Sequence, residues 1–364
     1  MPVKHQRRNI AIVGSGMAGL ASAWSLGLDH DVTLFERHSG VGIGAHALDL
    51  AGGTVDVPLR VLYPGYYPQL FDLLRQCGVG VEPLNAALSF SRAGGAVYFG
   101  YRNLQWLGHS WPWLPPAMLL QGDTRAICLD LGRFLLHAPQ ALHSGALQDC
   151  TLGDYLQSQH YSSTFCDYFL VPCFAGINTV SHADVRNYPA ELIAQYFTRS
   201  FMMSSVYRAV GGAGAIAAAL SQRVAQFRFN ARLRSVRRTA QGISVLHEDG
   251  RQERFDALVF ATQANQVLPL LGGASPEESS VLQGFRYGAV DVVMHQDPRA
   301  MPPQSSQWAP VNYVLSQEHD RPMVSIWVNH LLPTYTDMRP VFQTINHQPA
   351  DRHRRCLGVA AQPV

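Results

Sequence analysis

The stretch Ile10-Ala11-Ile12-Val13-Gly14-Ser15-Gly16-Met17-Ala18-Gly19 decides how the chain begins to fold. Four apolar residues precede glycines in the G-x-G-x-x-G spacing, which predicts a strand that turns directly into a helix. The glycines allow a tight turn and a close approach of a ligand to the backbone, and a helix N-terminus offers oriented N–H groups to an anion. A phosphate-binding turn is therefore expected at residues 14–19.

A second strand-like run, Asp31 to Phe35, ends at Glu36, 22 residues beyond Gly14. A dinucleotide site places the acid that accepts a ribose hydroxyl at an offset of ~20 residues. Strand, turn, helix, second strand and acid thus follow in the order of a β-α-β dinucleotide site. The basic start of the chain and the uncharged run from Asn9 to Leu28 are also typical of a secretory signal peptide, but the glycine spacing favours the strand and turn.

Composition narrows the function further. The chain has 364 residues, 47% apolar and 15% charged, and a net charge of +2, so it can bury a large core and has no general electrostatic reason to bind nucleic acid. A small-molecule partner is expected instead. The six cysteines form no C-x-x-C pair, which favours a reducing, cytoplasmic location without structural zinc or another metal.

Later segments indicate how the chain is divided. Residues 151–201 show a mostly helical pattern, and strand-like runs return at Ala231–Arg237, Ile243–His247 and Asp256–Thr262. We expect an α/β fold in which a Rossmann-like nucleotide-binding domain carries an inserted mixed α+β substrate domain. The expected bounds are 1–60 and 201–275 for the first domain, 61–200 and 276–346 for the second, and 347–364 for an irregular tail.

The segment Leu104–Leu120 is uncharged and rich in tryptophan, but its prolines break it too often for a helix that spans a membrane. We assign it to the substrate domain. Three interpretations are open: an aromatic core under a loop, an apolar substrate channel, or a shallow edge that makes peripheral contact with a membrane.

The motifs together resemble one family. Gly14–Leu20 with Glu36, Val210-Gly211-Gly212 and Phe255–Thr262 are similar to segments of the FAD-dependent amine-oxidase-like oxidoreductases, within a wider set that includes phytoene-desaturase-like enzymes. The resemblance implies a flavoprotein with noncovalent FAD, whose pyrophosphate faces the turn glycines and whose ribose binds Glu36. It also places the flavin near Gly42 and Gly44 and the adenine near Val236. The implied FAD contacts are Gly14, Ser15, Gly16, Met17, Ala18, Gly19, Glu36, Arg37, Gly42, Gly44 and Val236.

Two departures from the family pattern stand out. Many amine oxidases of this fold have a lysine near flavin N5, whereas Lys4 is the sole lysine here, so true amine oxidation is disfavoured. The recognisable pattern also stops near Asn346, and we expect the usual closing strand and helix over the flavin to be lacking.

The leading hypothesis is an FAD oxidoreductase that removes hydride from a C–H next to nitrogen, or at an allylic position, of a fairly apolar small molecule. One alternative is an NADPH-linked reductase, with a second turn at Gly212–Ala217 and 2′-phosphate ligands among Arg232, Arg234, Arg237 and Arg238. Another is a noncatalytic partner subunit. The catalytic residues are unknown; His46, His295 and Tyr313 are weak candidates, and the oligomeric state is open.

Overall fold

The computed structural model describes residues 6–106, 109–199, 205–316, 318–347 and 356–363, in which helices and strands are mixed as an α/β fold requires. The chain forms two compact units. The first comprises Met1–Ala47, Asp72–Gly80 and Ala209–Tyr287, and the second comprises Leu48–Phe71, Val81–Arg208 and Gly288–Val364. The first unit therefore also takes in residues 72–80, which the sequence placed in the substrate domain, and it extends to residue 287. Residues 48–60, which were expected in the nucleotide-binding domain, belong to the second unit.

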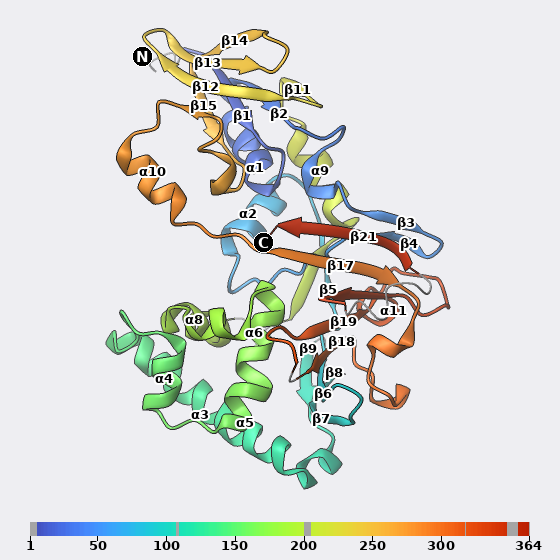
Figure 1. Cartoon of the computed structure of the whole chain (residues 1–364). Helices are drawn as coiled ribbons and strands as arrows, with labels where there is room; N and C mark the ends of the chain where they lie inside the picture. The colour runs from blue at the N-terminus through green and yellow to red at the C-terminus, as the bar shows by residue number, and fades with distance from the viewer. Residues whose placement is uncertain (1–5, 107–108, 200–204, 317, 348–355, 364) are drawn as a thin grey trace. The chain divides into compact units, whose positions relative to one another are not determined.

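A parallel sheet forms the centre of the first unit (Figure 1). Its order is β11-β2-β1-β15, and all neighbours are parallel. The predicted strand, helix and strand are present as β1 (Asn9–Val13), α1 (Met17–Leu26) and β2 (Asp31–Phe35). β1 is buried from Ile10 to Val13, as expected for a strand in the middle of a parallel sheet. The outer strands are β11 (Gln226–Arg228) and β15 (Ala257–Phe260).

A second sheet in this unit has the order β14-β13-β12-β16. Val236 and Val245 from this sheet pack with Phe35 and Phe255 in one core cluster, so that apolar side chains of the two sheets meet. The strands are β12 (Leu233–Thr239), β13 (Gly242–His247), β14 (Gln252–Phe255) and β16 (Leu271–Gly272). The remaining elements are η1 (Gly42–Gly44), the end of α2 (Pro68–Gln76), α9 (Gly212–Ser221), η4 (Ala264–Gln266) and α10 (Pro276–Gln283).

The second unit is built on a seven-stranded mixed sheet with the order β21-β17-β20-β19-β18-β6-β7 (Figure 1). β18 is parallel to β6, and the other pairings are antiparallel. The strands are β6 (Leu88–Arg92), β7 (Val97–Gly100), β17 (Ala289–His295), β18 (Val311–Leu315), β19 (Met323–Trp327), β20 (Phe342–Ile345) and β21 (Cys356–Pro363).

Helical segments contact this sheet and share an aromatic core with it. Phe90 of β6 stacks on Tyr313 of β18, with ring centroids 4.6 Å apart, and also contacts Phe169. The long helix α3 buries Ile127, Leu131, Phe134 and Ala138, which repeat at helical spacing. The helical elements are η2 (Pro116–Leu120), α3 (Gly122–Ser144), α4 (Leu152–Ser158), α5 (Ser163–Phe165), η3 (Cys166–Leu170), α6 (Val171–Asn178), α7 (His182–Arg186), α8 (Ala190–Arg199), η5 (Pro298–Ala300), η6 (Ser305–Gln307) and α11 (Val328–Leu331).

Three small two-stranded sheets complete the second unit. They are β3 (Leu48–Leu50) with β4 (Gly53–Val55), β5 (Val81–Leu84) with β10 (Val206–Ala209), and the hairpin of β8 (Arg102–Trp106) and β9 (His109–Trp113). The uncharged segment at 104–120 is thus a hairpin followed by η2. No helix in the described part of the chain has both the length and the apolar character needed to cross a bilayer.

The expectation of an irregular tail from residue 347 needs correction. Residues 356–363 form β21, which pairs antiparallel with β17 from Ala289 to His295. The sequence did not predict β21, because this strand is stabilised by pairing with β17, some 70 residues earlier in the chain, and no local sequence pattern indicates such a pairing.

Candidate functional site

The glycine turn after β1 has the close packing and the open side that its spacing predicts. Gly14 has a positive φ of 103°, and its N–H donates to the carbonyl of Phe35. A Cβ on Gly19 would lie 1.9 Å from the carbonyl oxygen of Gly14, so only glycine lets α1 start this close to the turn. Nothing lies within 4 Å of a Cβ placed on Gly16. The turn is therefore tightly packed between Gly14 and Gly19, whereas the space beside Gly16 is open.

The N-terminus of α1 is suited to an anion. Its N-cap residue is Gly16, no side chain caps the helix, and the first turn contains no acidic residue. The first N–H groups of a helix lack intrahelical acceptors and carry the positive end of the helix dipole. Met17 and Ala18 thus contribute backbone rather than side-chain chemistry to this end of the helix.

Glu36 lies at the end of β2, with only 6% of its surface exposed, and reaches the glycine turn. Its Oε2 accepts the N–H of Ser15 at 3.0 Å and the hydroxyl of Ser15 at 2.5 Å, and its Oε1 accepts the N–H of His38 at 2.9 Å. An ionised carboxylate has about four acceptor positions. One position remains for a further donor such as a ribose hydroxyl.

Ser15 connects this carboxylate to the next loop. Its Oγ accepts the N–H of Gly42 at 2.7 Å, and a Cβ on Gly42 would lie 3.1 Å from Glu36 Oε2. The turn, the acid and η1 thus meet around one serine hydroxyl. The sequence singled out all three residues, but it gave no sign that Ser15 links them through its side chain.

A second helix start adjoins η1. α9 begins after Gly211, whose φ is 77°, with no side-chain cap and no acid in its first turn, and it packs against η1. A Cβ on Gly44 would lie 3.9 Å from the N atom of Gly214. Two uncapped helix starts therefore belong to the same unit, as the glycines near 14 and 211 indicate.

Arg37 and Val236 were also predicted to contact FAD. Arg37 is exposed, and its Nε lies 3.1 Å from His38 Nε2. Val236 is 2% exposed, packs in the core cluster with Phe35, and donates its N–H to the carbonyl of Leu270. Its side chain is a core side chain in this structure.

The second glycine cluster differs from the turn after β1 in where its helix begins. α9 already begins at Gly212, so Gly214 is a helical residue, and β10 lies outside the described parallel sheet. Of the basic residues that follow, Arg238 is paired with Glu278 at 2.6 Å.

Two of the catalytic candidates are buried in the second unit. His295 is 2% exposed; its Nδ1 accepts the N–H of Asp297, and its Nε2 lies 2.7 Å from the hydroxyl of Thr344. Both ring nitrogens are therefore engaged within the protein. Tyr313 packs in the aromatic core, its hydroxyl lies 3.4 Å from the carbonyl of Cys173, and burial raises its pKa well above 10. These contacts indicate structural roles, whereas His46, just after η1, is exposed.

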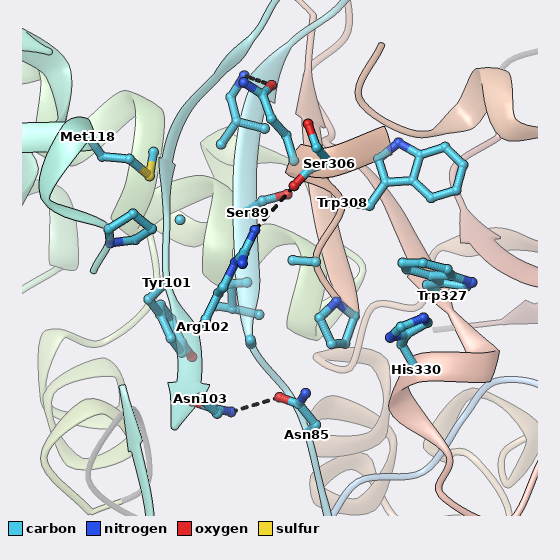
Figure 2. Close-up of a pocket in the computed structure, with 18 of the residues that line it drawn as sticks. Asn85, Ser89, Tyr101, Arg102, Asn103, Met118, Ser306, Trp308, Trp327 and His330 are labelled. Carbon is cyan, nitrogen blue, oxygen red and sulfur yellow. Dashed lines mark hydrogen bonds between the residues drawn. The ribbon is translucent and has the colours of Figure 1, made fainter. Parts of the chain in front are cut away.

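A pocket of about 480 Å³ opens in the second unit, at the edge of the seven-stranded sheet (Figure 2). Trp308, Trp327 and His330 lie on one side, and Tyr101 and Met118 lie on the other. The His330 ring lies against Trp327 with centroids 3.6 Å apart, and burial lowers its pKa. One interpretation of residues 104–120 was an apolar substrate channel, and Pro115 and Met118 of that segment line this pocket. The sequence did not indicate the other walls, because they come from segments near residues 85–103, 306–310 and 327–330.

A family model described as flavin containing amine oxidoreductase matches residues 17–340, nearly the whole chain. The chain belongs to this family. It is a flavin oxidoreductase, and its cofactor is FAD. The resemblance seen in the sequence is thereby confirmed, and a noncatalytic partner subunit is set aside.

Solved structures show that the family fold extends through the chain. A CLA-producing fatty acid isomerase from P. acnes is 15% identical with a TM-score of 0.69, and the match covers all of this chain and 88% of that one. Cyclohexylamine oxidase from Brevibacterium oxydans is 15% identical with a TM-score of 0.63, covering 99% and 85%. Putrescine oxidase is 14% identical with a TM-score of 0.63, covering 93% and 75%. No curated protein matches.

The residues of the first unit fit the ADP half of FAD. The open position at Gly16, the uncapped start of α1 and the remaining acceptor position of Glu36 suit a pyrophosphate and a ribose hydroxyl.

Proposed function

We propose that this flavin oxidoreductase removes hydride from a C–H next to nitrogen, or at an allylic position, of a fairly apolar small molecule. FAD, when bound, supplies the hydride acceptor. The first N–H groups of α1 bind its pyrophosphate, Gly16 leaves room for the approach, and Glu36 accepts from its ribose. Ser15 fixes the orientation of the Glu36 carboxylate through its hydroxyl.

The observation that carries the apolar substrate is the pocket of the second unit. Two tryptophans, a tyrosine and a methionine contribute to its walls, and its volume is within the range of about 300–1,000 Å³ that small-molecule sites occupy. Aromatic and thioether groups offer an apolar body large, polarisable contact surfaces. The apolar part of a substrate bound here would be oriented by the shape of the pocket and by contact with these side chains.

The test is spectroscopic. Purified protein is expected to show the absorption of oxidised flavin, directly or after incubation with FAD, and to lose it anaerobically when an apolar allylic or amine substrate is added. Protein that stays colourless after incubation with FAD would refute the proposal. Full flavin binding with reduction only by small hydrophilic substrates would refute the apolar substrate class.

We further propose that the β8–β9 hairpin makes shallow contact with a lipid bilayer. Leu104 and Trp111 are directly opposite on its two strands, and they are 49% and 57% exposed. Trp113, on the same face, is 39% exposed, and Leu120 of η2 is 82% exposed. Exposed apolar side chains that gather in this way mark interaction surfaces, and indole rings favour the interfacial region of a bilayer.

A further inference from the structure

The pocket in the second unit is lined by charge of one sign only. Of the described residues that line it, Arg102 alone carries a permanent charge, and no aspartate or glutamate is among them. Burial lowers the pKa of His330, which keeps that ring neutral near pH 7. The pocket therefore presents a single fixed positive charge to whatever enters it.

Arg102 is oriented but not neutralised. Its Nη2 donates to the carbonyl of Ser306 at 3.2 Å, and no described carboxylate lies within ion-pair distance of it. Figure 2 shows its side chain among the residues that line the pocket, close to Ser306. A guanidinium has five N–H donors in a planar fork, so one bond to a carbonyl leaves donors for a planar anion.

Two other arginines of the same unit differ in this respect. Arg92 pairs with Asp123 at 2.9 Å, and Arg299 pairs with Asp297. Arg125 is the useful comparison, because it too bonds only carbonyls, those of Leu119 and Leu120, but it does not line the pocket. The position of Arg102 within an aromatic pocket is thus what sets it apart.

The remaining walls suit an apolar body. Trp308 donates its indole N–H to the carbonyl of Pro302, so it has no need of a ligand acceptor. Asn85 and Asn103 bond each other at 3.1 Å, which satisfies part of their polar groups. The pocket thus combines one anion-binding group with mostly apolar or already bonded surroundings.

We propose that the substrate is an apolar monocarboxylate, whose carboxylate pairs with Arg102 and whose apolar body lies against Trp308, Trp327 and Met118. The inference rests on the proposed function and gives its substrate class. A cationic amine of the same size would meet the charge of Arg102 without a carboxylate in the described walls to offset it.

The test uses three probes of equal chain length: decanoate, decanol and decylamine. Decanoate and decylamine are titrated below their micelle concentrations, and decanol below its solubility limit, into the full chain after incubation with FAD at pH 7.5. Binding is followed by calorimetry and by tryptophan fluorescence. Decanoate is expected to bind at least tenfold more tightly than the other two. Arg102→Gln is expected to weaken the binding of decanoate about tenfold or more, because a hydrogen bond to a charged group contributes at that scale. The affinity for decanol should not change.

Arg125→Gln is the matched control, and it should bind all three probes like the wild type. Circular dichroism and FAD content verify that each variant is folded. Tighter binding of decylamine than of decanoate, an unchanged decanoate affinity in Arg102→Gln, or an equal loss in Arg125→Gln would each overturn the inference.

The two proposals fail in different ways. If decanoate binds in an Arg102-dependent manner but the protein takes up no FAD, the proposed function fails and the carboxylate site stands. If the flavin is reduced by an uncharged apolar compound equally fast in wild type and Arg102→Gln, while decanoate shows no preference, the carboxylate inference fails and the proposed function stands.

Discussion

Two alanine substitutions in the same turn should separate folding from FAD binding. Gly16 and Gly19 are three residues apart, yet a Cβ added to Gly19 lies 1.9 Å from a backbone oxygen and a Cβ added to Gly16 has nothing within 4 Å. Gly19→Ala should therefore act on the fold, and Gly16→Ala on the space that the pyrophosphate needs.

The magnitudes follow from these distances. Real Cβ atoms keep at least 3.0 Å from a heavy atom, so Gly19→Ala must push α1 and the Gly14 carbonyl apart by more than 1 Å, and both groups are backbone. Backbone shifts from overpacking cost about 1–3 kcal/mol, while alanine in place of glycine regains up to about 1 kcal/mol of helix propensity. We expect a net loss of about 1–2 kcal/mol in the free energy of unfolding.

Gly16→Ala meets no such clash. Its backbone at φ −69° suits alanine, and the change at the N-cap should cost less than about 1 kcal/mol. Its methyl group occupies the open side of the turn, so the FAD dissociation constant should rise by about tenfold or more. Urea unfolding of the apoprotein and flavin fluorescence titration measure the two effects. Wild-type FAD affinity in Gly16→Ala, or wild-type stability in Gly19→Ala, would refute this assignment.

Three further predictions follow from named contacts. Ser15→Ala removes the hydroxyl bonded to Glu36 and should weaken FAD about fivefold or more in the same titration; unchanged affinity would contradict the orienting role. Trp111→Ser should lower sedimentation with anionic vesicles without changing FAD content, and equal sedimentation would contradict bilayer contact. The hydrogen bond from Arg299 lowers the pKa of Asp297, so the stability this pair adds should be present above about pH 4, the unfolded-state value, and be lost as pH falls through the lowered pKa. Arg299→Gln should then differ from wild type in unfolding free energy at pH 6 but not at the acidic end; a difference that grows with acidity would contradict it.

The sequence predicted what local patterns determine. The run from Ile10 to Gly19 and the acid at Glu36 specify strand, turn and helix within a short window, because glycine geometry and apolar periodicity act over a few residues. The strand β21 and the pocket in the second unit depend on pairings between segments far apart in the chain, and no window reveals them. The Ser15 hydroxyl was missed for a related reason: its role is visible only once Gly42 folds back onto it.

The placement of His295 shows how a residue that resembles a catalyst can serve the site indirectly. Because His295 Nδ1 accepts the Asp297 N–H, Nε2 carries the proton and donates to Thr344; Thr344 then donates to Ser325, whose hydroxyl donates to the carbonyl of Ala300. This chain of hydrogen bonds thus connects Asp297 with Ala300, and both residues lie in the segment that follows β17. Asn312 secures the far end of the same segment, since its Oδ1 accepts the N–H of Ala309 at 2.9 Å.

That segment carries Trp308 to the wall of the pocket. Loss of the His295 ring should therefore make the position of Trp308 in the pocket wall less well defined, and it should not remove a catalytic acid or base. An effect on KM with an unchanged pH profile is the expected signature of His295→Phe, because the proton of His295 is committed to Thr344 and the ring is buried within the protein.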